Sequence, residues 1–304
     1  MEIIIGKTAG FCFGVKNAVT KAEEALKQNE EIYCLGELVH NKQVTKKLTQ
    51  KGMHFIDDIT EAKAKTVIRS HGVEKNIYKQ AENMEIELID LTCPKVLNIH
   101  NIAEEYAQKG FYIILTGDKN HPEMLGTASF CGEYYYILEK EEDIENAIDE
   151  FKKLKLSNIL LISQTTYSLE KFKKIADILQ KEIPNIEVIN TICNATKMRQ
   201  EETEQMAKDV DIMIIVGGKH SSNSNKLYEI AKKHCNNVLF VETADELNIK
   251  REFIGGKNHE NKPSVRIGIM AGASTPEESI VKVVEKLKEM WYNKKGKILK
   301  KKGR

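Results

Sequence analysis

Short apolar runs alternate with amphipathic stretches along most of the chain. Runs of four or five apolar residues, the length of a buried strand, occur at residues 32–35, 112–115, 159–162 and 212–216. Between them, apolar residues recur every three or four positions, as on one face of a helix; the stretch after Cys12 is an example. Strands that alternate with helices predict parallel sheets covered by helices, which is the α/β class.

Three of the junctions between strand and helix carry a cysteine and form a repeat. Each of Cys12, Cys93 and Cys193 follows an apolar run and a turn, and each precedes residues that can start a helix. A polar residue lies 28 positions after each cysteine (12 to 40, 93 to 121 and 193 to 221), at His40, His121 and Ser221. Equal intervals that each cross one helix and one strand indicate an internal repeat.

The repeat predicts three similar α/β units with mainly parallel sheets; if the units face one axis, their three cysteines converge on a central cavity. We expect the units at residues 1–90, 91–190 and 191–292, followed by a basic tail at 293–304. A third polar position in each unit, at less regular distances, is His71, Thr165 or Ser274. Because ligands gather outside the carboxyl ends of parallel strands, these polar positions are expected to form a ring around the cavity.

Composition narrows the functional class. The 304 residues include 46 basic and 45 acidic side chains, a net charge of +1 that argues against nucleic-acid binding. No apolar run approaches the roughly 20 residues that cross a membrane. The first residues lack the basic region and cleavage site of a signal peptide, so we expect a cytoplasmic protein. Six cysteines in such a chain indicate metal ligands or buried thiols rather than a disulfide framework.

The three repeated cysteines are candidate metal ligands. Three thiolates make an incomplete site with one open coordination position, as catalytic metal sites have. Thiolates bind zinc and also iron–sulfur clusters, and a four-iron cluster held by three cysteines would leave one iron open to a substrate oxygen. Helix starts favour the thiolate form. Cys34, Cys131 and Cys235 fall outside the repeat and are expected to be core or surface thiols.

The polar ring has the composition of an anion site. Its members are His40, His71, His121, Ser221, Ser222, Asn223 and Ser274. Imidazoles, hydroxyls, an amide and helix-start N–H groups suit a diphosphate, and two partly protonated histidines would match much of its charge. Glu123 is the one carboxylate attached to these positions. A buried cluster and an anion beside it should raise its pKa, which suits proton delivery, and Thr165 could hold a substrate hydroxyl and relay that proton.

Six motifs together resemble the 4-hydroxy-3-methylbut-2-enyl diphosphate reductase family, also called LytB. They lie at residues 10–15, 70–72, 92–94, 164–166, 221–225 and 271–274. The resemblance spans residues 1–291 and implies three α/β units around a pseudo-threefold axis. It also implies one 4Fe–4S cluster held by Cys12, Cys93 and Cys193, with the substrate hydroxyl on the remaining iron. Asn17 and a polar segment at 117–121 depart from the family pattern, without loss of a ligand position.

The resemblance further implies an oxidoreductase that closes the methylerythritol phosphate pathway of isoprene biosynthesis. Two electrons, from a donor protein such as ferredoxin or flavodoxin, and two protons would remove the hydroxyl as water and leave isopentenyl or dimethylallyl diphosphate. Glu123, with His121 beside it, would supply protons, Thr165 would hold the hydroxyl, and the seven residues of the polar ring would bind the diphosphate.

Other functions fit the same residues. A dehydratase would use the open iron only as a Lewis acid and would turn over without a reductant. A redox sensor or diphosphate-binding module on this scaffold would bind ligand but form no product. Zinc in place of iron would leave the protein colourless and inactive.

Overall fold

The computed structural model describes residues 1–28, 31–153, 158–183, 185–249 and 265–301. The strands form three four-stranded sheets, with orders β1–β12–β10–β11, β3–β2–β4–β5 and β7–β6–β8–β9. All strand pairings in this described part of the chain are parallel. The predicted α/β class with parallel sheets is therefore confirmed, whereas the pseudo-threefold arrangement around a cavity stays a prediction.

The chain divides into two compact units, which we describe separately. The first unit joins Met1–Cys12 to the chain from Ala195 onward, and the second is Phe13–Asn194. The sheet of the first unit has four strands: β1 (Glu2–Ile5), β10 (Ile212–Val216), β11 (Val238–Val241) and β12 (Arg266–Ala271). Its helices are α8 (Asn194–Asp209), α9 (Ser222–His234), α10 (Glu277–Lys301) and the short η3 (Ala244–Glu246).

Alternate residues of β10 supply the core on the two faces of this sheet. Ile212 and Ile214 pack in one cluster with Val283 and Leu287 of α10. Met213 and Ile215 pack in the other, which holds the buried apolar residues of α8 and α9. Since a strand buried on both faces needs an unbroken apolar run, the run at 212–216 forms a central strand.

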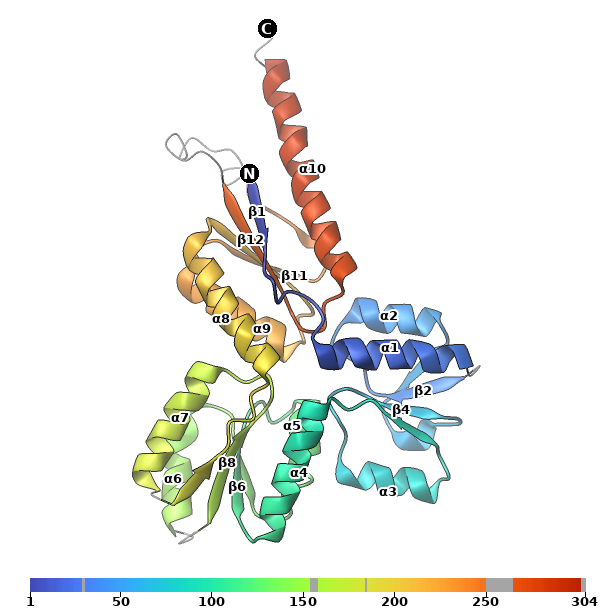
Figure 1. The fold of residues 1–304 in the computed structure, drawn as a ribbon, viewed down its shortest axis with the longest axis vertical. Helices are drawn as coiled ribbons and strands as arrows, with labels where there is room; N and C mark the ends of the chain where they lie inside the picture. The colour runs from blue at the N-terminus through green and yellow to red at the C-terminus, as the bar shows by residue number, and fades with distance from the viewer. Residues whose placement is uncertain (29–30, 154–157, 184, 250–264, 302–304) are drawn as a thin grey trace. The chain divides into compact units, whose positions relative to one another are not determined.

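The second unit holds the other two sheets (Figure 1). One contains β2 (Ile32–Leu35), β3 (Met53–Ile56), β4 (Thr66–Ile68) and β5 (Leu88–Asp90), with α1 (Phe13–Gln28), α2 (Lys42–Gln50), η1 (Ile59–Glu61) and α3 (Lys75–Asn83). The other contains β6 (Tyr112–Thr116), β7 (Tyr135–Leu138), β8 (Ile159–Ser163) and β9 (Ile186–Val188). Its helices are α4 (Pro94–Gln108), α5 (Pro122–Ala128), η2 (Glu141–Asp143), α6 (Ile144–Lys153) and α7 (Leu169–Glu182).

Helices cover both faces of the β7–β6–β8–β9 sheet. Tyr112 and Ile114 of β6 pack with the apolar faces of α6 and α7. Ile113 and Leu115 pack on the opposite face, with Met124 of α5 and the buried residues of α4. The short helix α5 is thereby fixed at the carboxyl end of β6, which places its first residues at the edge where ligands bind.

The position of the first strand corrects one expectation from the sequence. The run at residues 3–5 was predicted to belong to the first α/β unit, but β1 pairs with β12, with Ile3 opposite Ile267. Ile3 packs against the core cluster of the β10–β12 sheet, so this pairing covers apolar surface that β12 would otherwise expose. The predicted boundaries at residues 90 and 190 stay predictions.

The carboxyl-terminal segment also differs from its prediction. Helix α10 continues to Lys301, through most of the segment at 293–304 that was expected to be a tail, and residues 302–304 lie outside the described part. Within the described residues, no helix combines the length and apolar character that crossing a membrane requires.

Candidate functional site

The predicted polar positions all follow the carboxyl ends of central strands, as expected. His40 follows β2, His71 follows β4, His121 follows β6, Thr165 follows β8, Ser221 follows β10 and Ser274 follows β12. Parallel pairing brings the loops after β2 and β4 to one edge of their sheet, and the same holds for the loops after β6 and β8 and for those after β10 and β12.

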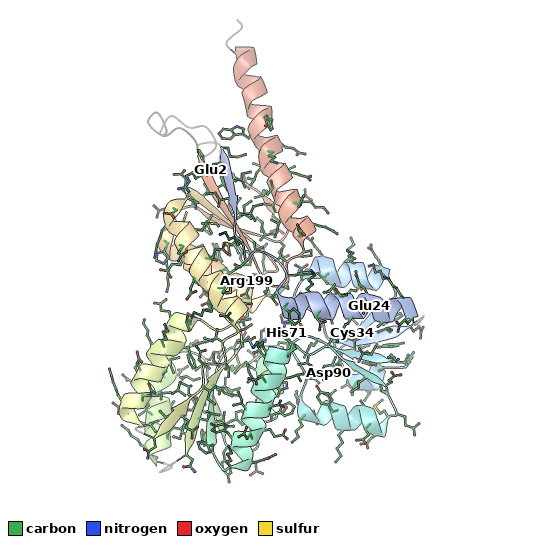
Figure 2. All side chains as sticks on the ribbon, viewed as in Figure 1. Glu2, Glu24, Cys34, His71, Asp90 and Arg199 are labelled. Atoms are coloured by element: carbon green, nitrogen blue, oxygen red, sulfur yellow. The ribbon has the colours of Figure 1, made fainter. Side chains whose placement is uncertain are left out.

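Three histidine rings of the second unit meet at one point. The His40 and His71 rings stack, with centroids 4.2 Å apart and planes inclined by 22°. The His121 ring stands edge-on to both, at 5.2 Å from His40 and 5.4 Å from His71. One ring nitrogen of each lies within 4.8 Å of the others. Loops that are far apart in the sequence therefore converge on a compact imidazole group, in which Figure 2 labels His71.

Two of these rings are neutral at pH 7. Burial lowers the pKa of His71 well below its ordinary value, and the neighbouring His40 and His121 lower it further. Burial, with His40 and Arg69, lowers the pKa of His121 to about 3. Low solvation and mutual repulsion thus keep these two rings neutral in the absence of a ligand. The sequence predicted partly protonated rings in contact with a diphosphate, and this stays a prediction. A bound anion would reverse the balance because it favours the charged ring.

The hydrogen bond of His121 fixes which of its nitrogens carries the proton. Its Nδ1 accepts a hydrogen bond from the Glu123 N–H at 3.1 Å, which caps the first turn of α5. In a neutral imidazole one nitrogen accepts and the other donates, so Nε2 bears the hydrogen. Neutral His121 can then donate to a phosphate oxygen, whereas a metal ion on Nε2 would have to displace that hydrogen. The histidine group is thus better suited to an anion than to a metal.

Glu123 and Thr165 form a buried pair. The Thr165 N–H donates to Oε1 of Glu123 at 2.6 Å, and the Thr165 hydroxyl donates to Oε2 at 2.7 Å. Burial raises the pKa of Glu123 to about 7, although both hydrogen bonds from Thr165 act to lower it. The carboxyl is therefore close to half-protonated at neutral pH. Because it is bonded to the Thr165 hydroxyl, it can exchange a proton through that hydroxyl with a group that Thr165 contacts. The pKa of this carboxyl is raised, as expected, but burial alone accounts for the rise here.

Each of the three repeated cysteines is held by an equivalent backbone hydrogen bond. The Cys93 N–H donates to the Ser70 carbonyl at 3.0 Å, and the Cys193 N–H donates to the Thr165 carbonyl at 3.0 Å. In the other unit, the Cys12 N–H donates to the Ala273 carbonyl at 3.1 Å. The acceptors are Ser70 next to His71, Thr165 itself, and Ala273 next to Ser274. Each cysteine is therefore bonded to the loop that carries the third polar position of its sheet.

The surroundings of the cysteines separate candidate ligands from core thiols. Cys12, Cys93 and Cys193 are partly exposed, whereas Cys34, Cys131 and Cys235 are buried. Burial raises the pKa of the Cys34 and Cys131 thiols to about 12, which makes them poor ligands. The exclusion of the latter three from the predicted site therefore has a physical basis.

Glycine is required at the start of α1 because Cys93 lies against it. A Cβ atom at Gly14 would lie 2.6 Å from the Cys93 sulfur, closer than any real contact. The first turn of α1, directly after Cys12, thus runs beside the cysteine that caps α4.

The first unit contributes a polar helix start of its own. Ser221 caps α9, and its hydroxyl accepts the Ser224 N–H at 3.3 Å. Asn223 is buried, and neither its amide oxygen nor its amide nitrogen has a partner among the described residues. A buried amide without partners costs free energy unless a ligand satisfies it, so this helix start has the features of a binding site.

Sequence reasoning missed Arg199 and Glu202, which hold the loop before Cys12. Arg199, labelled in Figure 2, is 4% exposed; its guanidinium donates to the Gly10 carbonyl at 2.7 Å and to the Ala195 carbonyl at 2.9 Å. Glu202 accepts hydrogen bonds from the Lys7 N–H at 2.6 Å and from the N–H and hydroxyl of Thr8. Two residues of α8 thereby fix the segment that carries a candidate ligand.

The sequence contains a signal that could have identified Arg199. The buried positions of α8 are mostly polar and follow helical spacing: Thr196, Arg199, Gln200, Thr203 and Ala207. A helix that buries a polar stripe must satisfy it with specific partners, which predicts a supporting role rather than ordinary core packing.

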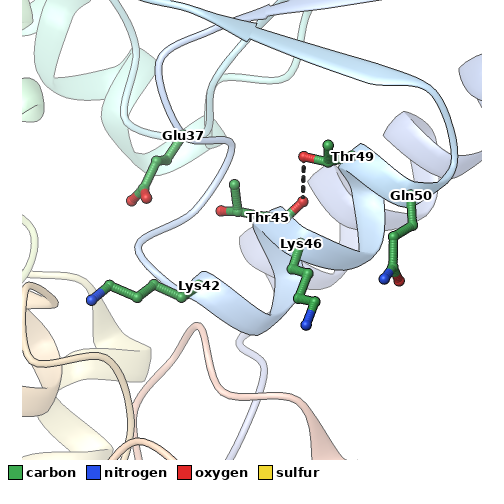
Figure 3. Close-up of a pocket in the computed structure, with 6 residues that line it drawn as sticks. All are labelled: Glu37, Lys42, Thr45, Lys46, Thr49 and Gln50. Carbon is green, nitrogen blue, oxygen red and sulfur yellow. Dashed lines mark hydrogen bonds between the residues drawn. The ribbon is translucent and has the colours of Figure 1, made fainter.

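An open pocket lies along α2 (Figure 3). It is lined by Glu37, Lys42, Thr45, Lys46, Thr49 and Gln50. Of these residues, Glu37 bears on the site, since its carboxylate lies 3.5 Å from Nδ1 of His40. That carboxylate can orient the His40 ring so that its other nitrogen faces the remaining two histidines.

The chain is similar to one well-defined group of proteins. A family model described as LytB protein matches residues 3–288. A 4-hydroxy-3-methylbut-2-enyl diphosphate reductase from Caldanaerobacter subterraneus subsp. tengcongensis is 41% identical over 95% of this chain and 98% of its own length. The protein of that name from Aquifex aeolicus is 38% identical over 95% of this chain and 97% of its own length.

Two solved structures resemble the fold. One, the (E)-4-hydroxy-3-methyl-but-2-enyl diphosphate reductase described as the terminal enzyme of the non-mevalonate pathway, has a TM-score of 0.67 and 37% identity over 95% of this chain and 100% of that one. The other, an E-1-hydroxy-2-methyl-but-2-enyl-4-diphosphate reductase from Plasmodium falciparum, has a TM-score of 0.81 and 29% identity over 93% of this chain and 87% of that one.

Binding of pyrophosphate is expected to take up protons at the histidine group. Because the anion raises the low pKa values of His71 and His121, binding should be strongest in acid and weaken as the pH rises through the bound-state pKa values. Calorimetry in buffers of different ionisation enthalpy measures the uptake. Replacing His71 by Asn should reduce it, whereas His54→Asn, at an exposed position, should leave it unchanged. Equal uptake in all three proteins would contradict the assignment.

The change Arg199→Met should loosen the loop before Cys12. It removes two hydrogen bonds from a buried charged group, each worth about 1.5–3 kcal/mol. We expect a lower thermal midpoint and faster modification of Cys12 by a thiol reagent, read by peptide mapping. Lys208→Met, which removes an exposed ion pair of the same helix, is the control and should change neither. If both variants behave alike, the guanidinium does not hold this loop.

Proposed function

Since this chain belongs to the LytB family, we propose that it reduces (E)-4-hydroxy-3-methylbut-2-enyl diphosphate. In the proposed reaction, two electrons and two protons convert the substrate to isopentenyl or dimethylallyl diphosphate and one water. This reaction closes the methylerythritol phosphate route to isoprenoids. The single observation that carries the proposal is the buried Glu123–Thr165 pair, whose carboxyl has a pKa of about 7 and lies on the helix that His121 caps.

The cofactor of the proposed reaction is one 4Fe–4S cluster held by Cys12, Cys93 and Cys193. Their partial exposure, their place at helix starts and the equivalent backbone hydrogen bond that each one makes support this assignment. Three thiolates suit a four-iron cluster that keeps one iron without a protein ligand. When bound, the cluster would pass single electrons to the substrate and act as a Lewis acid toward its hydroxyl group.

The diphosphate ligands of the proposal come from both units. In the second unit, His40, His71 and His121 offer ring N–H groups, and His121 donates even when it is neutral. In the first unit, the candidates are Ser221, Ser222, Asn223 and Ser274. The unpartnered buried amide of Asn223 and the start of α9 support their role. The low pKa values of two histidines imply that charge compensation arrives as protons with the substrate.

Proton delivery in the proposal runs through Glu123 and Thr165. The Thr165 hydroxyl donates to the carboxylate of Glu123, so the two groups can exchange a proton over 2.7 Å. Thr165 would hold the substrate hydroxyl, and the protonated carboxyl would supply the proton that leaves with it as water. Burial of both side chains excludes bulk water as a competing proton source. A protein such as ferredoxin or flavodoxin would supply the electrons.

Replacing any one of the three cysteines by serine should nearly abolish reductant-dependent turnover and lower the iron content. The control is Cys131→Ser, because that thiol is buried and not a proposed ligand. Anaerobic purification with iron and sulfide counts, followed by assay with a reductant, tests the proposal. Four variants of equal activity would refute the ligand set. Turnover without any reductant would instead indicate a dehydratase, and a colourless zinc protein would exclude the cluster.

The change Glu123→Gln should slow turnover by a factor of about 10²–10⁴, the usual contribution of a general acid, while substrate binding persists. The parent enzyme should lose rate as the pH rises through about 7, because its carboxyl must be protonated to act. The variant should lack that step. Thr165→Val should also be slow, and Thr165→Ser, which keeps the hydroxyl, should restore much of the rate. A parental rate in Glu123→Gln would remove this residue as the proton source.

A further inference from the structure

The proposed reduction, on which this inference rests, needs single electrons from another protein. An exposed phenyl ring lies directly beside a proposed cluster ligand. Phe13, the residue after Cys12 and the first of α1, is 79% exposed, the largest value among the large apolar side chains in the described part of the chain. A single exposed apolar side chain needs no explanation. The side chains next to Phe13, however, indicate a function for it.

A second exposed apolar side chain and two lysines accompany Phe13. On α4, which Cys93 caps, Lys95 is exposed and Leu97 is 36% exposed. On α1, Lys16 is exposed one turn after Phe13. The two helix starts are neighbours, because the α-carbon of Gly14 lies against the Cys93 sulfur.

The lysines are unusual at this place. Neither Lys16 nor Lys95 forms an ion pair with any described residue, and the first turns of α1 and α4 contain no acidic residue. A lysine near a helix start opposes the helix dipole and so lowers helix stability. Local helix stability therefore does not account for these residues.

We propose that Phe13, Lys16, Lys95 and Leu97 form the docking surface for a small acidic protein that carries one electron at a time. Redox encounters use small interfaces in which steering by opposite charge sets the association rate. Aromatic and aliphatic side chains make up the desolvated centre of such contacts. This surface combines both features next to the sulfur of a proposed ligand, so a bound carrier would have a short path to the cofactor.

Helix α8 carries a similar combination, although its lysine, Lys197, forms an ion pair with Glu201 at 3.9 Å. It begins after Cys193, with Lys197 exposed and Met198 49% exposed. All three cysteine-led helices thus present one lysine and one large apolar side chain within five residues of the cysteine.

The lysines have a competing explanation, which is to offset the negative charge of a bound cluster and substrate. The two explanations predict different kinetics. A docking role affects only reduction by a protein carrier, whereas charge compensation affects turnover with every reductant and also alters the absorption spectrum and iron content of the holoenzyme.

The test compares two reductants in the cluster-containing enzyme. For the double variant Lys16→Glu/Lys95→Glu, we expect kcat/KM for reduced ferredoxin, an acidic iron–sulfur protein, to fall by about 10–100-fold, within the range of electrostatic steering. The rate with reduced methyl viologen, a small cation, should stay within about twofold of the parent rate. Added salt should slow the parent enzyme with ferredoxin and have little effect on the variant. Phe13→Ser should weaken ferredoxin turnover without changing its salt dependence.

The control is Lys79→Glu, an exposed lysine on α3, which should behave as the parent enzyme with both reductants. Equal losses with ferredoxin and methyl viologen in the double variant, or an unchanged ferredoxin rate, would overturn the docking surface. A parent enzyme that forms no product with methyl viologen would instead contradict the proposed function, so the two failures are distinguishable.

Discussion

The backbone hydrogen bond of each repeated cysteine is the constraint on which the candidate site depends. In each case an edge strand ends, the chain turns, and the cysteine N–H donates to a carbonyl in the loop after a central strand. Because the acceptor loops also carry His71, Thr165 and Ser274, this one bond sets each cysteine beside a polar residue of the same sheet edge. The geometry follows from parallel pairing, which brings strand ends and helix starts together.

Burial has opposite effects on the acids and bases of the second unit. Low solvation disfavours charge, so it raises the pKa of Glu123 and lowers the pKa values of His71 and His121. At pH 7 the site therefore contains two neutral imidazoles and a carboxyl that is close to half-protonated. Such a site stores protons on the carboxyl and gains them on the imidazoles when an anion binds, which matches a reaction that consumes protons on a diphosphate.

The sequence correctly predicted which residues lie at the carboxyl edges of the sheets. Each interval of 28 residues crosses one helix and one strand, so the residue that ends the interval must follow the end of a strand. It could not predict which sheet β1 joins, since an edge strand of three isoleucines fits any partially covered sheet. The direction of the Glu123 pKa shift was predicted. The low pKa values of His71 and His121 in the protein without ligand were not, because the burial and the ring contacts of these histidines are known only from the structure. Arg199 was missed because a search for hydrophobic periodicity does not detect a buried helix face made of polar residues.

That polar stripe shows what α8 contributes in place of apolar burial. A helix with Arg199, Gln200 and Thr203 on its buried face gives up much of the hydrophobic stabilisation of an ordinary core helix. In return, its guanidinium and the Glu202 carboxylate hold five hydrogen bonds, four of them to the loop before Cys12. Although burial raises the pKa of Glu202, its bonds to Thr8 and Lys7 bring that pKa below the ordinary value, so the carboxylate stays charged and paired. Directional bonds fix a loop in one conformation, which apolar contacts do less well, and Cys12 would require that precision as a proposed cluster ligand.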